Sequence, residues 1–307
     1  MSLSGKIAMG TLRMITKIFP KAKINITNVE DELKKAKVYN KKHKYSTPKS
    51  RKVLYKEVSI AGYPCLIIRA EKRYPIKDKA ILYIHGGMRN SWKEDLVVAR
   101  GYSMRTGMDV WYPVYPSATE VPITKSIEVI YAMYRKMTMK YGADKIALMG
   151  CSFGGQFAFE MINWNNRCKT PVGMPAILIA LSPGGVPETE EDWRLMRKYA
   201  EKDPIINIQA MELIEDVCVS FGEEIPGHAL HPIEEDFHNA PPTYVYYAEE
   251  TCAGNAAAYV RAYERDGSGD KMHMHIQRGM MHGYACIPIF PESRRAYREQ
   301  IELIHGI

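Results

Sequence analysis

A serine between two glycines ends an apolar run near the middle of the chain. Residues 148–157 read LMGCSFGGQF, so Ser152 is the centre of a G-x-S-x-G pattern framed by Gly150 and Gly154. Apolar residues typical of a buried strand precede the pattern, and residues typical of a helix follow it. In this setting the pattern favours a tight strand-to-helix turn that exposes the serine oxygen and needs glycines for lack of space. Ser152 is therefore a candidate nucleophile, the alternative being a small residue in a glycine-rich loop.

A second glycine-rich stretch ends a strand-like segment about 65 residues upstream of Ser152. It reads His85-Gly86-Gly87, and such a loop lets backbone N–H groups approach a developing oxyanion closely. The expected donors are the amides of Gly87 and Met88, together with the amide of Phe153 after the candidate nucleophile. His85 is expected to brace this loop by hydrogen bonding rather than to act as a base.

A histidine near the C-terminus could serve as the base that a serine nucleophile requires. The segment GMMHGY carries His282 after the last strand-like segment. With an acid between them, the chain order serine, acid, histidine is the order expected of α/β-hydrolases. A loop histidine with structural hydrogen bonds only is the alternative.

Together, these motifs resemble the hormone-sensitive-lipase-like branch of the α/β-hydrolases, a group of bacterial esterases and lipases. The resemblance covers residues 53 to 305 approximately, and five matches occur in the family's order. HGGM resembles its HGGG loop, YPVYPSATEVP its YRLAPEHPFP segment, GCSFGG its GDSAGG, HPIEEDFHNAPPTYVYYAEE the stretch leading to the acid, and GMMHGY the histidine loop.

The chain departs from the family pattern at three positions beside the expected site. Met88 replaces the third glycine of the HGGG loop, although its amide can still donate. Cys151 stands where the family has aspartate, and Phe153 stands where it has alanine. Because Phe153 would narrow the acyl pocket, the resemblance implies a preference for short acyl chains.

The acid of the expected catalytic triad needs a choice between neighbours. Counted from Pro241-Pro242, the family's acidic position falls on Thr251, which cannot serve. Glu250 precedes it by one residue and Glu249 by two. A glutamate can orient a histidine and stabilise its protonated ring as an aspartate does. We expect Glu250 to be the acid, with Glu249 as the second choice.

The elements that must position these residues alternate between strand-like and helix-like patterns from residue 53 onward. Such alternation predicts an α/β-hydrolase fold, a mostly parallel sheet covered by helices on both faces. Ser91 and Glu94 have the spacing of a helix-starting capping box, and Gly107 can end that helix. The expected strands are 53–60, 64–71, 80–87, 109–116, 145–150, 176–183, 243–250 and 271–277, and the main expected helices are 91–107, 123–134, 155–166, 255–267 and one from 292.

Two segments interrupt this alternation and are expected to form a helical cap. The first is residues 1–50, and the second is an insertion at about 186–238 within a hydrolase domain of residues 51–307. Insertions at the carboxyl ends of parallel strands lie where such sheets bind ligands. In the first segment Ala8, Leu12, Ile15 and Phe19 have the spacing of one helix face.

Charge and cysteine content narrow the function classes. Residues 34–52 hold nine Lys or Arg and no acid, which exceeds the net charge of +7. This run is expected to be a solvated linker or cap rather than a nucleic-acid site, because no binding motif accompanies it. The six cysteines lack paired CxxC spacing and indicate reduced thiols in a cytoplasmic protein. No apolar run reaches the roughly 18 residues of a membrane span.

The combined prediction is a serine carboxylesterase that hydrolyses short-chain esters through an acyl-enzyme. An amidase or peptidase on the same site, or a non-catalytic ligand-binding protein, are the alternatives. No cofactor and no metal are expected, since His228, His231 and His238 fit no compact zinc pattern. The expected partner is a small ester, without nucleic acid or stable membrane insertion, and the resemblance adds a homodimer as one expected assembly.

Overall fold

One mixed sheet runs through the molecule in the computed structural model, which describes residues 1–307 except 19–23, 25, 72–74, 223–224 and 232–233. Its eight strands among the described residues have the order β1-β2-β4-β3-β5-β6-β7-β8. β2 pairs antiparallel with β1 and β4, and all the other pairs are parallel. The strands are β1 (Val53–Ile60), β2 (Tyr63–Ala70), β3 (Ile76–Ile84), β4 (Met108–Pro113), β5 (Ile146–Cys151), β6 (Ile177–Leu181), β7 (Thr243–Ala248) and β8 (Met272–Gln277).

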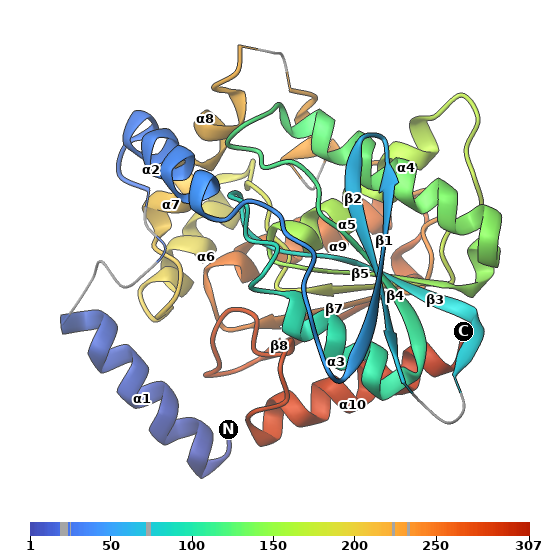
Figure 1. The fold of residues 1–307 in the computed structure, drawn as a ribbon. Helices are drawn as coiled ribbons and strands as arrows, with labels where there is room; N and C mark the ends of the chain where they lie inside the picture. Colours follow the sequence, from blue (N-terminus) through green and yellow to red (C-terminus); the bar gives the residue numbers. More distant parts are fainter. Residues whose placement is uncertain (19–23, 25, 72–74, 223–224, 232–233) are drawn as a thin grey trace.

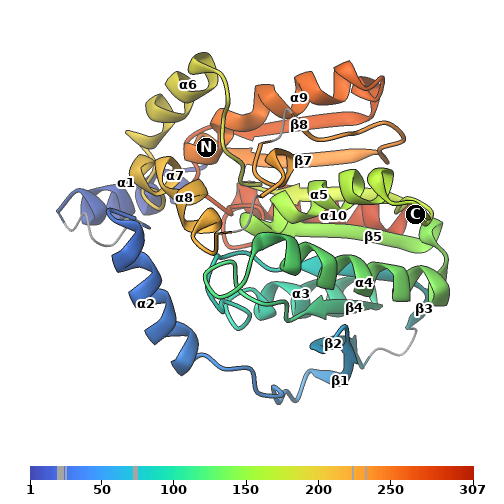
Figure 2. The same ribbon diagram turned by 90° about the horizontal axis from the view of Figure 1, so that it is seen from above.

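Helices cover both faces of this sheet (Figures 1 and 2). One core layer packs α4 (Ile123–Tyr141), α5 (Phe153–Arg167) and α9 (Ala256–Arg265) on the sheet, and the other packs α3 (Leu96–Thr106) and α10 (Pro291–His305). Side chains of β3 alternate between the layers, since Leu82 belongs to the first and Ile81 and Tyr83 to the second. Both faces are therefore buried, as the apolar strands predict. Short 3-10 turns lie at Ala143–Lys145, Gly227–Ala229, Thr251–Asn255 and Gly269–Lys271.

The predicted strands and helices of residues 53 to 305 are present, and the hairpin is one example. Ala61 and Gly62 join β1 to β2 with positive φ angles of 50° and 81°. A two-residue hairpin turn of the I′ type requires positive φ at both positions. Glycine adopts this conformation without strain, which explains its place in the turn.

The start of α3 differs from its prediction. The helix begins at Leu96, and Asp95 is the N-cap, so the capping box predicted at Ser91 and Glu94 is wrong. Glu94 instead accepts a hydrogen bond from the hydroxyl of Tyr39 at 2.6 Å. Gly107 ends the helix as predicted, with a φ of 79°.

Helices from both interrupting segments lie together at one end of the sheet (Figure 1). They are α1 (Leu3–Ile18) and α2 (Val29–Lys42) from the first segment, and α6 (Glu190–Ala200), α7 (Ile208–Glu212) and α8 (Ile214–Val219) from the second. Backbone bonds join the segments, because Ile24 donates to Ile205 at 2.7 Å and Asn207 donates to Ile24 at 2.9 Å. Ile26 also packs with Ala210. The two segments thus form one covering layer, although the domain boundaries remain a prediction.

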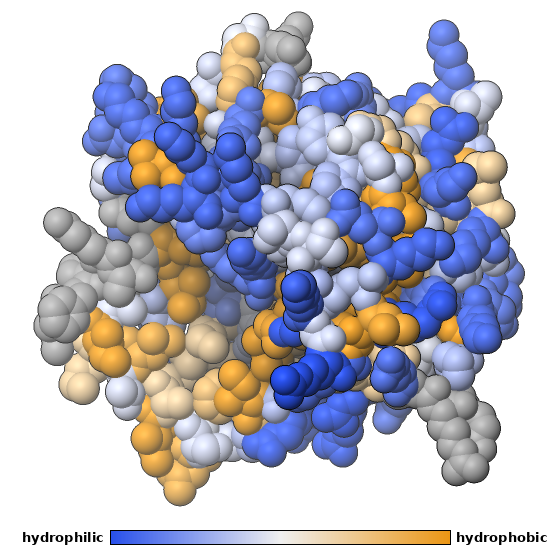
Figure 3. All heavy atoms as spheres, in the orientation of Figure 1, coloured by the Kyte–Doolittle hydropathy of each residue, from blue (hydrophilic) through white to orange (hydrophobic). Residues whose placement is uncertain are grey.

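The first helix buries a different face from the predicted one. Gly5, Met9 and Thr16 are its buried residues among those described, whereas Ile15 is 43% exposed. Phe19, the last residue of the predicted face, lies outside the described residues. Figure 3 shows hydrophobic side chains over α1 and hydrophilic ones over α2 on the same side of the molecule. In the described part of the chain, no helix has the length and hydropathy to span a bilayer.

Candidate active site

Ser152 lies at the turn between β5 and α5 in a strained backbone conformation. Its φ of 53° and ψ of −123° are rare for a residue other than glycine. Neighbouring glycines permit the turn, since a Cβ on Gly150 would lie 2.0 Å from the carbonyl oxygen of Gly154. A Cβ on Gly154 would in turn lie 2.3 Å from the carbonyl oxygen of Ile84. Such strain persists only where the surroundings enforce it, often at functional sites.

The predicted oxyanion loop runs directly beside Ser152. A Cβ on Gly86 would lie 3.2 Å from the Cβ of Ser152, so the two backbones are closely packed. Gly87 has a φ of 87°, which favours glycine at that position. Gly87, Met88, Ser152 and Phe153 line one cavity. The three residues expected to supply amide donors and the candidate nucleophile therefore border the same space.

Buried polar groups hold this loop. His85 donates from Nδ1 to the carbonyl of Gly86 at 2.9 Å and stacks on the ring of Tyr115 at 4.2 Å. Burial lowers the pKa of His85 to about 4, which keeps the ring neutral. The amide of Gly86 donates to Asp95 Oδ2 at 2.7 Å, and burial raises the pKa of that carboxyl to about 6. His85 thus braces the loop, in agreement with its expected role.

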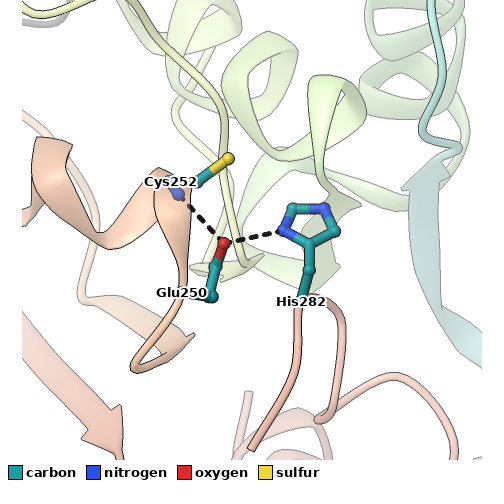
Figure 4. Close-up of side chains that lie close together, drawn as sticks. All are labelled: Glu250, Cys252 and His282. Carbon is teal, nitrogen blue, oxygen red and sulfur yellow. Dashed lines mark hydrogen bonds and ion pairs between the residues drawn. The ribbon is translucent and has the colours of Figure 1, made fainter. Parts of the chain in front are cut away.

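The structure brings Glu250 and His282 together (Figure 4). His282 donates from Nδ1 to Glu250 Oε2 at 3.0 Å, and the amide of Cys252 donates to the same oxygen at 3.0 Å. Glu250 follows β7 and is fully buried, whereas Glu249 is half-buried and its amide donates to the carbonyl of Gln277 on β8. The carboxylate facing the imidazole is therefore that of Glu250.

The remaining ring nitrogen of His282 is free to exchange a proton. Its Nε2 is buried and has no hydrogen-bond partner among the described atoms. Burial alone would lower the pKa of His282, but the Glu250 carboxylate, together with the charges of Asp203 and Asp95, outweighs burial, so this pKa lies above its ordinary value. Because Nδ1 carries the proton shared with Glu250, a neutral ring presents Nε2 as a base.

The loop carrying His282 is attached to the elbow that carries Ser152. The sulfur atoms of Cys286 and Cys151 are 3.1 Å apart, and Cys151 immediately precedes Ser152. The amide of Gly283 donates to Ser182 Oγ at 3.0 Å, just beyond β6. These contacts assemble residues from the ends of separate strands at one edge of the sheet.

Glu250, Cys252 and His282 also offer metal-ligating atoms within 4.8 Å of one another. The carboxylate and imidazole atoms already bond to each other. Burial raises the pKa of the Cys252 thiol well above its ordinary value, and metal ligation requires a thiolate. The donor set therefore fits an acid–histidine pair better than a metal centre.

A cavity of about 440 Å³ opens beside Ser152 and is lined in part by residues of α2, α7 and α8. One wall is apolar and includes side chains of the insertion together with Ile24 and Ile26. The other is polar and comes from α2 and from the loop after Met88. The apolar wall contains Ile24, Ile26, Ile206, Ala210, Met211 and Ile214, and the polar wall contains Glu32, Tyr39, Arg89, Ser91 and Glu94.

A partly buried ion pair beside the predicted oxyanion loop has no counterpart in the sequence prediction. Arg89 contacts Glu32 at both ends of the carboxylate, with distances from 2.6 to 2.8 Å. Asn40 on the same helix accepts from the amide of Asn90 at 2.8 Å. No short sequence motif predicts these contacts. Positions 32, 36 and 40 share one helix face and are buried in the structure, but nothing in the sequence marks a glutamate and an asparagine there as buried.

Comparison with known proteins agrees with this fold. A family model described as alpha/beta hydrolase fold matches residues 81–286, about two thirds of the chain. The chain belongs to the α/β-hydrolase family. The family and fold predicted from the motifs are thereby confirmed.

Individual relatives of this α/β-hydrolase are distant in sequence. It is 25% identical over 269 residues to a protein named esterase from Acinetobacter venetianus, with 83% of each chain covered. An esterase of the bacterial hormone-sensitive lipase family shares its fold with a TM-score of 0.77 and 21% identity, covering 100% of this chain and 98% of that one. A hormone-sensitive lipase from a metagenome library has a TM-score of 0.72 at 20% identity, covering 92% and 99%.

Proposed function

We propose that this α/β-hydrolase is a serine carboxylesterase that cleaves short-chain esters through an acyl-enzyme. The observation that carries the proposal is the 3.0 Å bond between His282 Nδ1 and the buried Glu250. That bond leaves Nε2 without a partner among the described atoms, on a loop attached to the strained elbow of Ser152. The curated relative named esterase supports the same activity.

In the proposed reaction, Ser152 Oγ attacks the ester carbonyl and His282 Nε2 takes its proton. Glu250 holds the ring in the required tautomer and stabilises its protonated form. The amides of Gly87, Met88 and Phe153 donate to the oxygen that becomes negative in the tetrahedral intermediate. His282 then protonates the departing alcohol, and a water molecule, deprotonated by the same nitrogen, releases the acid.

The preference for short acyl chains rests on the shape of the site. Phe153 replaces a small residue of the family pattern, is 4% exposed and packs against Phe157 with ring centroids 4.8 Å apart. A packed aromatic ring does not withdraw easily, because protein interiors have few voids. It therefore limits the room beside the nucleophile for a long chain.

Hydrolysis of p-nitrophenyl esters of increasing chain length tests the proposal. The wild type should turn over acetate and butyrate faster than the longer esters, and Ser152→Ala should lose turnover by about three orders of magnitude or more. Matched p-nitroanilides tell an amidase from an esterase. A folded wild type without turnover of any ester would favour a binding protein, and unchanged turnover in Ser152→Ala would remove Ser152 from the mechanism.

A further inference from the structure

The polar wall of the cavity has a distinct charge pattern. Glu32 and Tyr39 come from α2, while Arg89, Ser91 and Glu94 come from the loop that follows the expected oxyanion donors. Polar groups in a mostly apolar pocket fix the orientation of a ligand and set its specificity. Their chemistry therefore indicates which esters the cavity accepts.

One carboxylate of this wall lacks a cationic partner among the residues that line the cavity. Arg89 and Glu32 neutralise each other through a bidentate contact. Glu94 accepts from the hydroxyl of Tyr39 at 2.6 Å, and burial raises the pKa of Tyr39 to about 12, so that hydroxyl stays neutral. The lining groups thus carry two carboxylates against one guanidinium, and the wall is negative at Glu94.

The wall also offers hydrogen-bond donors and acceptors to a ligand. The hydroxyl of Ser91 and the guanidinium of Arg89 can donate, and the carboxylate of Glu94 can accept. A hydroxylated group satisfies such a surface, whereas an anionic group meets like charge at Glu94.

We propose that the substrates are esters with one apolar arm and one uncharged, hydroxylated arm, and that Glu94 disfavours anionic esters. This inference rests on the proposed esterase function. The apolar arm occupies the wall formed by Ile26, Met211 and Ile214, and the hydroxylated arm faces Arg89 and Glu94.

The long-range electrostatic field of the protein favours anionic ligands, which is the opposite of the effect proposed for Glu94. The net charge is +7, and α2, which contributes Glu32 and Tyr39 to the cavity lining, also carries exposed lysines. Such a surface attracts anions. A penalty against anionic esters must therefore come from local groups, which makes it a specific signature of Glu94.

Two matched ester series test this inference on the whole protein. The first contains butanoates of 1-propanol, glycerol and 3-hydroxypropanoic acid, which vary the alcohol. The second contains ethyl butanoate, ethyl 3-hydroxybutanoate and monoethyl succinate, which vary the acyl arm. In at least one series, kcat/KM should be no lower for the hydroxylated ester than for the apolar one. In that series the anionic ester should fall at least about fivefold below the hydroxylated one, as expected for like charges at a partly exposed site.

Two variants test whether the penalty against the anionic ester comes from Glu94 itself or from the overall charge of the protein. Glu94→Gln should reduce the penalty against the anionic ester by about threefold or more. Glu120→Gln removes the same charge from an exposed residue that does not line the cavity, and should leave the penalty unchanged. Equal rates for anionic and hydroxylated esters in both series, or an unchanged penalty in Glu94→Gln, would overturn the inference while turnover persists. Absence of all ester turnover would instead defeat the esterase function and this inference with it.

Discussion

At the scale of single residues, Ser152 combines a strained backbone with a position beside the expected oxyanion donors. Its positive φ costs on the order of 1–3 kcal/mol, which the surrounding fold must offset. At positions 150 and 154 a Cβ would collide with backbone atoms, so the turn requires glycine at both. The strain is thus a property of the position and should be measurable without any assay of activity.

Replacing Ser152 by glycine or alanine isolates this strain. Both variants lack the hydroxyl, but only glycine adopts a positive φ without penalty. We expect Ser152→Gly to have a free energy of unfolding about 1 kcal/mol above that of Ser152→Ala. Urea denaturation of the two proteins measures the difference, and a lower value for the glycine variant would mean that the turn is not strained.

The Glu250–His282 pair predicts how activity depends on pH. A neutral His282 is needed as base, and its raised pKa places the rise of kcat/KM above the ordinary histidine value of about 6.5. Glu250→Gln removes the charge that raises this pKa, so burial then dominates and the rise moves to lower pH. The rate should also fall by about two to four orders of magnitude.

Glu249→Gln is the matched control for this profile. Glu249 is adjacent in sequence and only half-buried, and its amide pairs with β8. Its variant should retain both the rate and the pH profile within about threefold. If this variant shifts the profile and Glu250→Gln does not, the acid has been assigned to the wrong carboxylate.

At the scale of elements, α2 does more than cover the cavity. One face of this helix carries Glu32, Tyr39 and Asn40, and all three contact the loop after Met88. Ser117 adds a short hydrogen bond from its hydroxyl to the carbonyl of Met88. The position of the Met88 amide therefore depends on contacts from outside the sheet.

Removing one partner of the Arg89–Glu32 pair should disturb that amide. Glu32→Gln leaves the guanidinium without its charge partner and should lower kcat for p-nitrophenyl butyrate about tenfold, with a smaller change in KM. Combining it with Arg89→Gln removes both charges, so the double variant should recover part of the loss. If the loss in the double variant equals the sum of the losses in the two single variants, the pair does not act as a unit.

Elements were largely predictable from the sequence because their signals are local. Apolar runs ending at glycine predicted β3 and β5, and the spacing of Ile123, Ile127 and Ile130 predicted α4. The predicted buried face of α1 was wrong at Ile15, which is exposed, whereas Gly5, Met9 and Thr16 are buried among the described residues of this helix. The predicted start of α3 failed because Glu94 pairs with Tyr39, 55 residues away.

The candidate site shows the same contrast between residues with local sequence signals and residues that depend on tertiary contacts. Ser152 and His282 belong to short motifs, so their positions could be predicted from the chain alone. For the acid, the sequence left a choice between Glu250 and Glu249, because the alignment with the family pattern could be shifted by one residue. The hydrogen bond to His282 identifies Glu250 as the carboxylate that faces the imidazole. Asp95, which holds the amide of Gly86, belongs to no motif and depends on tertiary contact.

At the scale of the whole molecule, charge is distributed unevenly along the chain. The basic run at residues 34–52 lies on α2 and the segment after it, and its lysines are exposed. The cavity beside Ser152 is lined by two carboxylates, one guanidinium and mostly apolar groups. We therefore expect the cavity, rather than this basic surface, to select the substrate.

The activity should not depend on a bound metal ion. The atoms of Glu250 and His282 that could ligate an ion are already joined by a hydrogen bond, and the Cys252 thiol is held protonated by burial. Prolonged treatment with EDTA followed by gel filtration should leave kcat for p-nitrophenyl butyrate within about 20% of the untreated value. Loss of activity that zinc restores would assign a metal to this cluster.

Covalent labelling tests the central claim, that Ser152 is a nucleophile activated by His282, most directly. After incubation with a fluorophosphonate, the intact mass should increase by one phosphonyl group, and peptide mass spectrometry should locate it on Ser152. His282→Ala should react far more slowly. A folded wild type that remains unlabelled, or a label on another residue, would contradict the account.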